Sequence, residues 1–478
     1  MILTALMLIV IVPVVGLVID VGIMYTMRAR LASACDAAAL AGARSLAVGA
    51  TLADQEAAAR ARAQTFFNAN FPSGTFESKN AQATVSLDES ISHTRTVTVS
   101  GTATAPVYFM QIFGVSGSLV GATGAAARRD VNVILVLDRS GSLETAGACD
   151  DLEAAAKSFT NLFANQRDRM GMITFGGAYR VDYAMTKSFK QSPALADQID
   201  VLYPGGCSGW TGSAQALWKG YQQLVALNEP GSLNAIVFFT DGQPNTVTAQ
   251  FNVKTQATPE SSSKSRCYDW GNDVNYASPS WNPVNQQYLG FIAGGTWIDG
   301  VYKPDAPAMP VSEERSFVTN PVGYTAATAQ NASSDCRYRS NSVNVLYDIA
   351  AYPSTDYYGN SMFGYKTVET YPGGHPYAGK IKFVAANLEN AAVNAVDNAA
   401  QRIRSRALDP NIAVTTYVVG LGGVGAAENE VLRRIANTKD STAYDSSAPK
   451  GLYLYSPTAA QLSAAFATIA SEILRLSR

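Results

Sequence analysis

The chain has 478 residues, enough for about three domains of ordinary size. Its formal net charge of -2 excludes the strongly basic surface on which nucleic-acid-binding proteins depend, so no nucleic-acid partner is expected. Hydrophobic residues make up 47% of the chain, which excludes an intrinsically disordered protein. With only two histidines, His93 and His375, the composition argues against a histidine-based catalytic site, and we expect a protein that is not an enzyme.

The first residues form a long apolar run. Ile2 to Ile19 contain no charge and reach the lower length limit of a membrane-spanning helix. A cleaved signal peptide is the alternative, but it needs a basic segment before the apolar run and a small-residue cleavage site. No basic residue precedes the run, so we expect an uncleaved anchor, continued by a helix, over residues 1–48.

The two signals for the orientation of this anchor conflict. Arg28, Arg30 and Arg44 follow the apolar run, and the positive-inside rule would place them in the cytoplasm. The placement of the cysteines, described below, favours an oxidising exterior. We favour the exterior for the bulk of the chain.

A small α+β module is expected at residues 49–129. Thr51 and Asp54 form a capping-box pattern that predicts the start of a helix reaching about Asn70. Arg95 to Ala105 alternates between apolar and polar residues, as in a half-buried strand, and two further strands are expected at 83–87 and 119–125.

From residue 130 to the C-terminus, buried strands alternate with helices. Val131 to Leu137 is almost continuously apolar, which is typical of a strand covered on both faces. The alternation predicts an α/β fold with a doubly wound, mostly parallel sheet. Strands are expected at 131–137, 170–175, 179–183, 234–239 and 412–419, and helices at 151–165, 213–225, 386–407, 427–436 and from Ser456-Pro457 onward. An aromatic-rich stretch at about 243–385 interrupts the pattern, and we expect it to be a folded insertion.

Polar side chains gather where the central strands of this sheet end. Asp138, Ser140 and Ser142 follow the first strand, Asp241 follows the strand at 234–239, and Thr211 lies just before a helix. The carboxyl ends of adjacent strands in a doubly wound sheet face one crevice, so these side chains can converge. Two carboxylates and three hydroxyls form an all-oxygen shell that suits Mg²⁺, or Mn²⁺, better than a Ca²⁺ cage.

This pattern resembles the metal-ion-dependent adhesion site of von Willebrand factor A domains. The resemblance covers about 131–242 and 386–478. It implies that Asp138, Ser140 and Ser142 hold the ion, that Thr211 and Asp241 act directly or through water, and that a ligand carboxylate completes the shell.

The N-terminal part resembles the TadE/TadG-like proteins of bacterial tight-adherence (Flp-type) pilus systems. The resemblance rests on the apolar anchor, on Arg28-Ala29-Arg30-Leu31 and on the alanine-rich segment from Asp36 to Ala43. The chain departs from that family by lacking the short basic segment that usually precedes the anchor. The resemblance implies a bacterial envelope protein with a single membrane pass and its C-terminal bulk in the periplasm or at the cell surface.

Five cysteines are present, and four of them allow three pairings. Cys149 follows the expected ion loop and Cys207 precedes Thr211, so a disulfide between them would brace the site. Cys267 and Cys336 both lie in the insertion and would pair there. Cys35 is left over beside the membrane, either free or bridging a second subunit.

We therefore expect an exterior-facing adhesion or pilus-assembly protein, anchored in the inner membrane, that grips an acidic side chain of a partner through Mg²⁺. The partner would be a protein ligand or another pilus or cell-surface component. The alternative is a structural minor subunit or scaffold of a pilus system in which the ion only stabilises the fold. An ion-dependent or carboxylate hydrolase is a third, weaker alternative, given the scarcity of histidine.

Overall fold

The computed structural model describes residues 2–177, 179–200, 207, 209–252, 266–269, 272–275, 287–293, 297–301, 338–339, 351–375, 377–382, 384–423 and 427–476. The chain divides into two compact units. The first contains Met1–Val131, Leu162–Asp168 and Leu474–Arg478, and the second contains Asn132–Asn161 and Arg169–Ile473.

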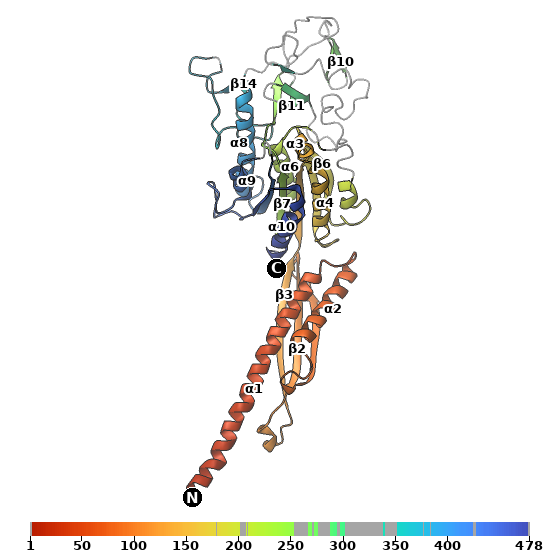
Figure 1. Cartoon of the computed structure of the whole chain (residues 1–478), viewed down its shortest axis with the longest axis vertical. Helices are drawn as coiled ribbons and strands as arrows, with labels where there is room; N and C mark the ends of the chain where they lie inside the picture. Colours follow the sequence, from red (N-terminus) through yellow and green to blue (C-terminus); the bar gives the residue numbers. More distant parts are fainter. Residues whose placement is uncertain are drawn as a thin grey trace. The chain divides into compact units, whose positions relative to one another are not determined.

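Two helices and a three-stranded antiparallel sheet build the first unit (Figure 1). Thr51 caps the second helix as predicted: its Oγ1 accepts from the Asp54 backbone N–H at 3.2 Å, and its own N–H donates to the Asp54 carboxylate at 3.2 Å. The elements are α1 (Ile2–Ser45), α2 (Leu52–Asn70), the short 3₁₀ helices η1 (Thr75–Glu77) and η2 (Met110–Phe113), and the strands β1 (Lys79–Asp88), β2 (Thr94–Ala105) and β3 (Ser118–Arg129).

The small residues of α1 pack into the core of this unit. Ala34, Ala38 and Ala43 are at most 1% exposed and belong to one core with α2 and β2. A Cβ placed on Gly124 of β3 would lie 2.5 Å from the Asp36 backbone nitrogen, so α1 and β3 approach closely. The expected anchor segment at 1–48 and the expected module at 49–129 therefore form one unit, because α1 supplies one wall of its core.

The predicted membrane anchor is not confirmed. Within the described part of the chain, no helix meets the combined length and apolarity of a bilayer-crossing segment.

The second unit is built on a six-stranded sheet in the order β17-β16-β7-β4-β5-β6. The neighbouring pairs β17–β16, β16–β7 and β4–β5 are parallel, and the edge strand β6 is antiparallel, so the predicted mostly parallel sheet is confirmed. Its strands are β4 (Val131–Asp138), β5 (Arg169–Phe175), β6 (Tyr179–Thr186), β7 (Leu233–Thr240), β16 (Val414–Leu421) and β17 (Tyr453–Ser456).

Helices cover both faces of this sheet (Figure 1). The core on one face joins α6, α8 and α9 to alternate residues of the central strands, such as Ile134 and Ile236. On the other face Phe466 of α10 packs against Phe159 of α4 and Phe239 of β7. The helices are α3 (Gly141–Thr145), α4 (Cys149–Thr160), α5 (Leu195–Asp200), α6 (Ser213–Ala226), α8 (Ala385–Arg404), α9 (Asn429–Ala436) and α10 (Leu462–Leu476).

The predicted start of the last helix is wrong. Ser456 is the final residue of β17, and its hydroxyl donates to the Thr458 carbonyl at 2.9 Å. A 3₁₀ turn, η4 (Ala459–Gln461), follows before α10 begins at Leu462. The Ser-Pro pair here ends a strand, because pairing with β16 outweighs the local capping signal.

Part of the expected insertion at 243–385 is described. Four strands form a sheet in the order β13-β12-β11-β8, and the pairs β10-β9 and β14-β15 form two further two-stranded sheets. These strands are β8 (Val247–Asn252), β9 (Arg266–Asp269), β10 (Asn272–Asn275), β11 (Gln287–Ala293), β12 (Trp297–Val301), β13 (Tyr338–Arg339), β14 (Ala351–Tyr352) and β15 (Ile381–Lys382). Residues 243–246, 353–375, 377–380 and 384 are described as well, mainly as turns and loops, and the other residues of the insertion lie outside the described part of the chain.

Candidate metal-ion site

The five predicted ion ligands lie where the direction of winding of the sheet changes. β4 stands between β7 and β5 in the sheet, and the chain leaves β4 toward β5 on one side and later returns to β7 on the other. In a doubly wound sheet the crevice at such a point is the usual place for a ligand. Asp138 is the last residue of β4 and Asp241 directly follows β7, so both carboxylates stand at this crevice.

Two local hydrogen bonds fix the Asp138 carboxylate, which is 0% exposed. The Ser140 backbone N–H donates to Oδ1 at 2.8 Å, and the Thr240 hydroxyl donates to Oδ2 at 2.5 Å. Each oxygen of Asp138 therefore has a partner that holds its orientation before any ion binds. The role of Thr240 was not predicted from the sequence. Thr240 is the last residue of a buried strand, and nothing in the sequence pattern distinguishes it from a residue that only packs in the core.

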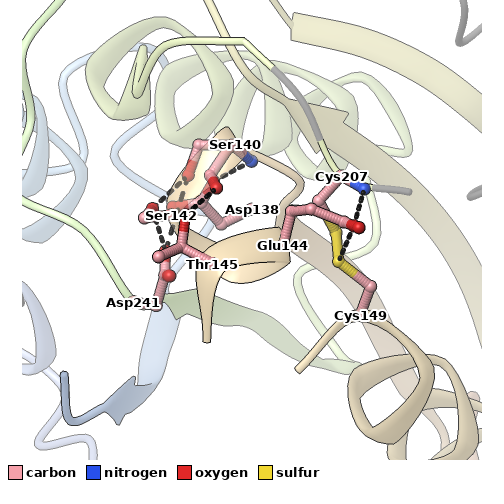
Figure 2. The surroundings of a disulfide bond; sticks show 9 residues. Asp138, Ser140, Ser142, Glu144, Thr145, Cys149, Cys207 and Asp241 are labelled. Carbon is pink, nitrogen blue, oxygen red and sulfur yellow. Dashed lines mark hydrogen bonds between the residues drawn. A yellow bond between two sulfur atoms is a disulfide. The ribbon is translucent and has the colours of Figure 1, made fainter. Parts of the chain in front are cut away.

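Two serines connect the first loop to Asp241 (Figure 2). The Ser142 hydroxyl donates to Asp241 Oδ1 at 2.9 Å, and the Oγ atoms of Ser140 and Ser142 lie 3.0 Å apart. Ser140 Oγ is also 3.4 Å from Asp241 Oδ1. The structure thus brings Asp138, Ser140, Ser142 and Asp241 together, as the sequence spacing predicted.

Thr211 reaches the same place from the loop before α6. A Cβ built on Gly242 would lie 3.3 Å from both Thr211 Oγ1 and Ser142 Oγ, so the two hydroxyls flank the bare backbone of that glycine. The Thr211 loop is held by Asn245, whose side-chain oxygen accepts from the Thr211 N–H at 2.8 Å while its own N–H donates to the Thr211 carbonyl at 3.1 Å. Asn245 carries no sequence signal for this role.

The two carboxylates are unusually reluctant to ionise. Burial and the neighbouring Asp241 carboxylate raise the pKa of Asp138 to about 8. Burial also raises the pKa of Asp241, to about 6. A divalent cation between these groups would favour their charged forms, and the site fits such an ion in the chemistry of its donors: two carboxylates and three hydroxyls.

An ion at this crevice would need the hydroxyl oxygens as well as the two carboxylates. Among the described residues, no group of three or more Asp, Glu, His or Cys side chains is placed to hold a metal ion. An ion at the crevice would thus depend on Ser140, Ser142 and Thr211 for part of its shell. Such a shell suits a hard cation that keeps some of its water.

A disulfide lies beside the site, as predicted for Cys149 and Cys207 (Figure 2). Cys149 is the first residue of α4, and its Cα lies 6.2 Å from that of Cys207. Glu144 of α3 connects this bridge to the ion loop, because its carboxylate accepts from the Cys207 backbone N–H at 3.2 Å. The bridge therefore braces the turn that carries Ser142.

The other cysteine predictions differ in outcome. Cys35 is a buried free thiol of α1, which agrees with the free-thiol alternative and leaves no exposed sulfur for a second subunit. Cys336 and the side chain of Cys267 lie outside the described residues, so their pairing stays a prediction.

The sheet order and the converging side-chain oxygens are those of a von Willebrand factor A-type domain, and residues 132–268 match the family model described as "von Willebrand factor type A domain". Residues 1–45 match the model described as "Putative Flp pilus-assembly TadE/G-like". The chain thus joins a TadE/G-like N-terminal segment to a von Willebrand A-type domain.

Curated relatives share only part of the chain. A calcium-activated chloride channel regulator 3A-1 of Mus musculus is 27% identical over 131 residues, which are 27% of this chain and 14% of that protein. Calcium-activated chloride channel regulator 1 of Sus scrofa is 32% identical over 124 residues, 25% of this chain and 13% of that protein. The matched part thus spans only about one seventh of these relatives.

Solved structures give distant likenesses. The vWF domain of the type V pili tip protein Mfa5 from Porphyromonas gingivalis is 13% identical with a TM-score of 0.36, covering 74% of this chain and 98% of that one. The PilB minor pilin from Streptococcus sanguinis is 11% identical with a TM-score of 0.34, covering 83% and 79%. At these scores the likenesses add nothing to the fold already described.

Proposed function

We propose that the chain is a membrane-anchored, exterior-facing adhesion or pilus-assembly protein of the bacterial envelope. Its A-type domain would bind Mg²⁺ through Asp138, Ser140, Ser142, Thr211 and Asp241, and a carboxylate of a partner protein would complete the ion's shell. Mn²⁺ is the second candidate ion, because it takes the same oxygen ligands in the same geometry.

One observation carries this proposal: residues from three separate loops place two buried carboxylates and three hydroxyls around a single point. The hydrogen bonds from Ser140 and Ser142 to Asp241 and from Thr240 to Asp138 organise the oxygens without enclosing them in a cage of acids. A shell with few charged ligands leaves a bound cation with positive charge and with exchangeable water. That arrangement supports recognition of an acidic side chain.

The proposed location rests on the N-terminal segment. The match of residues 1–45 to a pilus-assembly family supports an envelope protein. The uncharged run from Ile2 to Ile19 supports an anchor in the inner membrane, with the C-terminal bulk in the periplasm or at the cell surface. The disulfide between Cys149 and Cys207 supports an oxidising compartment for the A-type domain.

The structural alternative, a minor subunit or scaffold, needs a surface that packs against other subunits. The small-residue face of α1 that could have packed against other subunits is buried against α2, β2 and β3 of the same chain. We therefore rank the ion-dependent adhesion role first.

Asp138→Ala tests the proposal directly. The purified full chain should bind Mg²⁺ in isothermal titration calorimetry and should capture a partner from bacterial envelopes in Mg²⁺ but not in EDTA. Asp138→Ala should lose both properties while keeping the circular dichroism spectrum of the wild type. Glu389→Ala on α8, which also removes one carboxylate from this domain but from an exposed position, serves as the matched control.

Two outcomes separate the candidate roles. If Asp138→Ala folds normally and still captures the partner, the adhesion role is wrong. If it loses Mg²⁺ binding and melts at a lower temperature but keeps partner capture, the ion only stabilises the fold, as the structural alternative requires. Deleting 245–380 asks further whether the insertion recognises the partner.

A further inference from the structure

The loop between β2 and β3 is attached to the N-terminal half of α1. The carboxylate of Asp20, which is 0% exposed, accepts three backbone N–H groups from this loop: Tyr108 at 2.9 Å, Phe109 at 3.0 Å and Met110 at 2.8 Å. One turn earlier, the position of a Cβ on Gly16 is filled by the Phe109 ring, whose nearest carbon is 2.3 Å away. Gly16 and Asp20 thus form a seat for the loop.

The direction of β2 leads this loop toward the start of α1. Val97 at the beginning of β2 touches Gly42 of α1, and Gly101 lies against Cys35 and Leu31. The loop then meets Asp20 and Gly16, so each step along β2 moves toward the N-terminus of the helix. The far end of the hairpin is visible beside the lower part of α1 in Figure 1.

The loop carries an apolar tip that its own unit leaves uncovered. Ile112 and Phe113 in η2 are 75% and 72% exposed. Earlier in the loop, Tyr108 is 48% exposed and its hydroxyl donates to the Glu77 carboxylate at 2.9 Å. From the Glu77 carboxylate of η1, through Tyr108, to Ile112 and Phe113, the side chains change from charged to aromatic to apolar, which is the order of polarity found across a membrane–water interface.

The neighbouring surface of α1 is apolar over most of its circumference. Leu17, Val18 and Ile19 are 48%, 66% and 44% exposed, and three consecutive residues of a helix point about 200° apart in total. The remaining side is the seat for the β2–β3 loop. A protein groove covers one stripe of a helix, whereas lipid surrounds it, so this exposure fits a bilayer as the occupant.

We propose that the β2–β3 loop inserts Ile112 and Phe113 into the phospholipid bilayer beside α1, on the side of the folded units, and that Asp20 holds the loop at this depth. The inference rests on the proposed anchor. Ile2 lies about 27 Å along the helix from Asp20, close to the roughly 30 Å of a hydrocarbon core, so the Asp20 level falls at the interface. The three N–H donors satisfy the carboxylate where water is scarce.

The test uses an environment-sensitive fluorescent residue, dansylalanine, inserted in the full chain in place of Phe113. The protein is reconstituted into vesicles of phosphatidylethanolamine and phosphatidylglycerol, and quenching by nitroxide-labelled acyl chains is compared with quenching by aqueous iodide. Ile91, which is 65% exposed in the turn at the other end of β2, is the matched control position. Val14 of α1, 56% exposed, reports the anchor itself.

The proposal expects lipid quenching at positions 113 and 14 and iodide quenching at position 91. Lipid quenching at 14 with iodide quenching at 113 would overturn the loop proposal and leave the anchor standing. Lipid quenching at position 113 but not at position 14 would support the loop as a membrane contact and contradict the proposed anchor. Iodide quenching at both positions would overturn both.

Asp20→Ala tests the positioning role. It should reduce lipid quenching at position 113 several-fold while quenching at position 14 stays at the wild-type level, because the loop loses its seat but α1 keeps its apolar surface. Asp20→Asn, which keeps one acceptor oxygen, should fall between the two. Unchanged quenching at 113 in Asp20→Ala would show that Asp20 does not set the depth of the loop.

Discussion

The hydroxyl of Ser142 donates to Oδ1 of Asp241 at 2.9 Å, across 99 residues of sequence. This bond joins the first turn after β4 to the loop after β7, and it lies between the two acids of the candidate ion site. It also places a neutral hydroxyl, rather than a third acid, beside Asp241. The affinity of the site for a cation should therefore depend on Ser142 even though that residue carries no charge.

Ser142→Ala should weaken Mg²⁺ binding about tenfold, or about 1.4 kcal/mol, because it removes one oxygen ligand and one hydrogen bond to Asp241. Isothermal titration calorimetry of the full chain measures this directly. Thr145→Ala on the same short helix is the matched control, since it also removes one hydroxyl, which donates to the Gly141 carbonyl at 3.2 Å. Equal affinities for the two variants would remove Ser142 from the ion's shell.

Gly242→Ala should damage the site more than the fold. The new methyl group would lie 3.3 Å from the hydroxyl oxygens of Thr211 and Ser142, tight enough to push both aside by a few tenths of an ångström. We expect several-fold weaker Mg²⁺ binding and a loss of at most about 1–2 kcal/mol in the free energy of unfolding. Urea unfolding in EDTA, run beside the calorimetry, separates the two effects; wild-type affinity in this variant would mean that the ion does not sit between these hydroxyls.

The sheet could be predicted well because its signals are local. Val131 to Leu137 had to be a strand buried on both faces, and the structure places every residue of β4 in the core. The boundary at Ser456-Pro457 could not be predicted, because pairing of β17 with β16 is a long-range interaction that overrides capping residues. The packing of α1 into the core of the first unit also depends on long-range contacts, so it could not be predicted from the composition of α1 alone.

The convergence of the candidate site's side chains was predictable to the extent that these residues follow strands. Asp138 and Asp241 mark the ends of β4 and β7, and the parallel arrangement of the sheet brings them together. Thr240 and Asn245 were missed, since their roles are to hold Asp138 and Thr211 in place through hydrogen bonds. Such roles depend on how loops fold over one another, which no residue spacing encodes.

Reducing the disulfide between Cys149 and Cys207 should lower the free energy of unfolding by about 4 kcal/mol, since the bridge closes a loop of 58 residues in the unfolded chain. It should also weaken Mg²⁺ binding modestly, because Glu144 loses a fixed partner in Cys207 and the turn carrying Ser142 loosens. Cys149→Ser measured by urea unfolding and calorimetry tests both parts. Cys35→Ser, which removes the buried free thiol of the other unit, controls for the loss of a sulfur. Unaltered Mg²⁺ affinity in Cys149→Ser would show that the bridge stabilises the fold without shaping the site.

A buried acid away from the ion site gives a pH dependence with a definite sign. Asp356 is 5% exposed, and its Oδ1 accepts from the backbone N–H groups of Tyr358 at 2.9 Å and Asn360 at 2.7 Å. Burial outweighs these bonds and raises the pKa of Asp356 to about 6, from an ordinary value of 3.8. Between these two values the folded protein keeps a proton that the unfolded chain has released.

Because the folded pKa is the higher one, the contribution of Asp356 to stability is complete below about pH 4 and is lost as the pH rises through about 6. Asp356→Asn cannot ionise, so the wild type should lose about 1–3 kcal/mol relative to this variant between about pH 4.5 and pH 7.5. Urea unfolding of both proteins across this range measures the difference. EDTA is present so that no divalent cation binds at the candidate ion site. Glu389→Gln, on the exposed face of α8, is the control: its free energy of unfolding should change with pH as that of the wild type does. If the free energy of unfolding of Asp356→Asn also changes with pH as that of the wild type does, the Asp356 carboxylate is already ionised in the folded protein at acid pH. Its backbone donors, rather than its burial, then govern its charge.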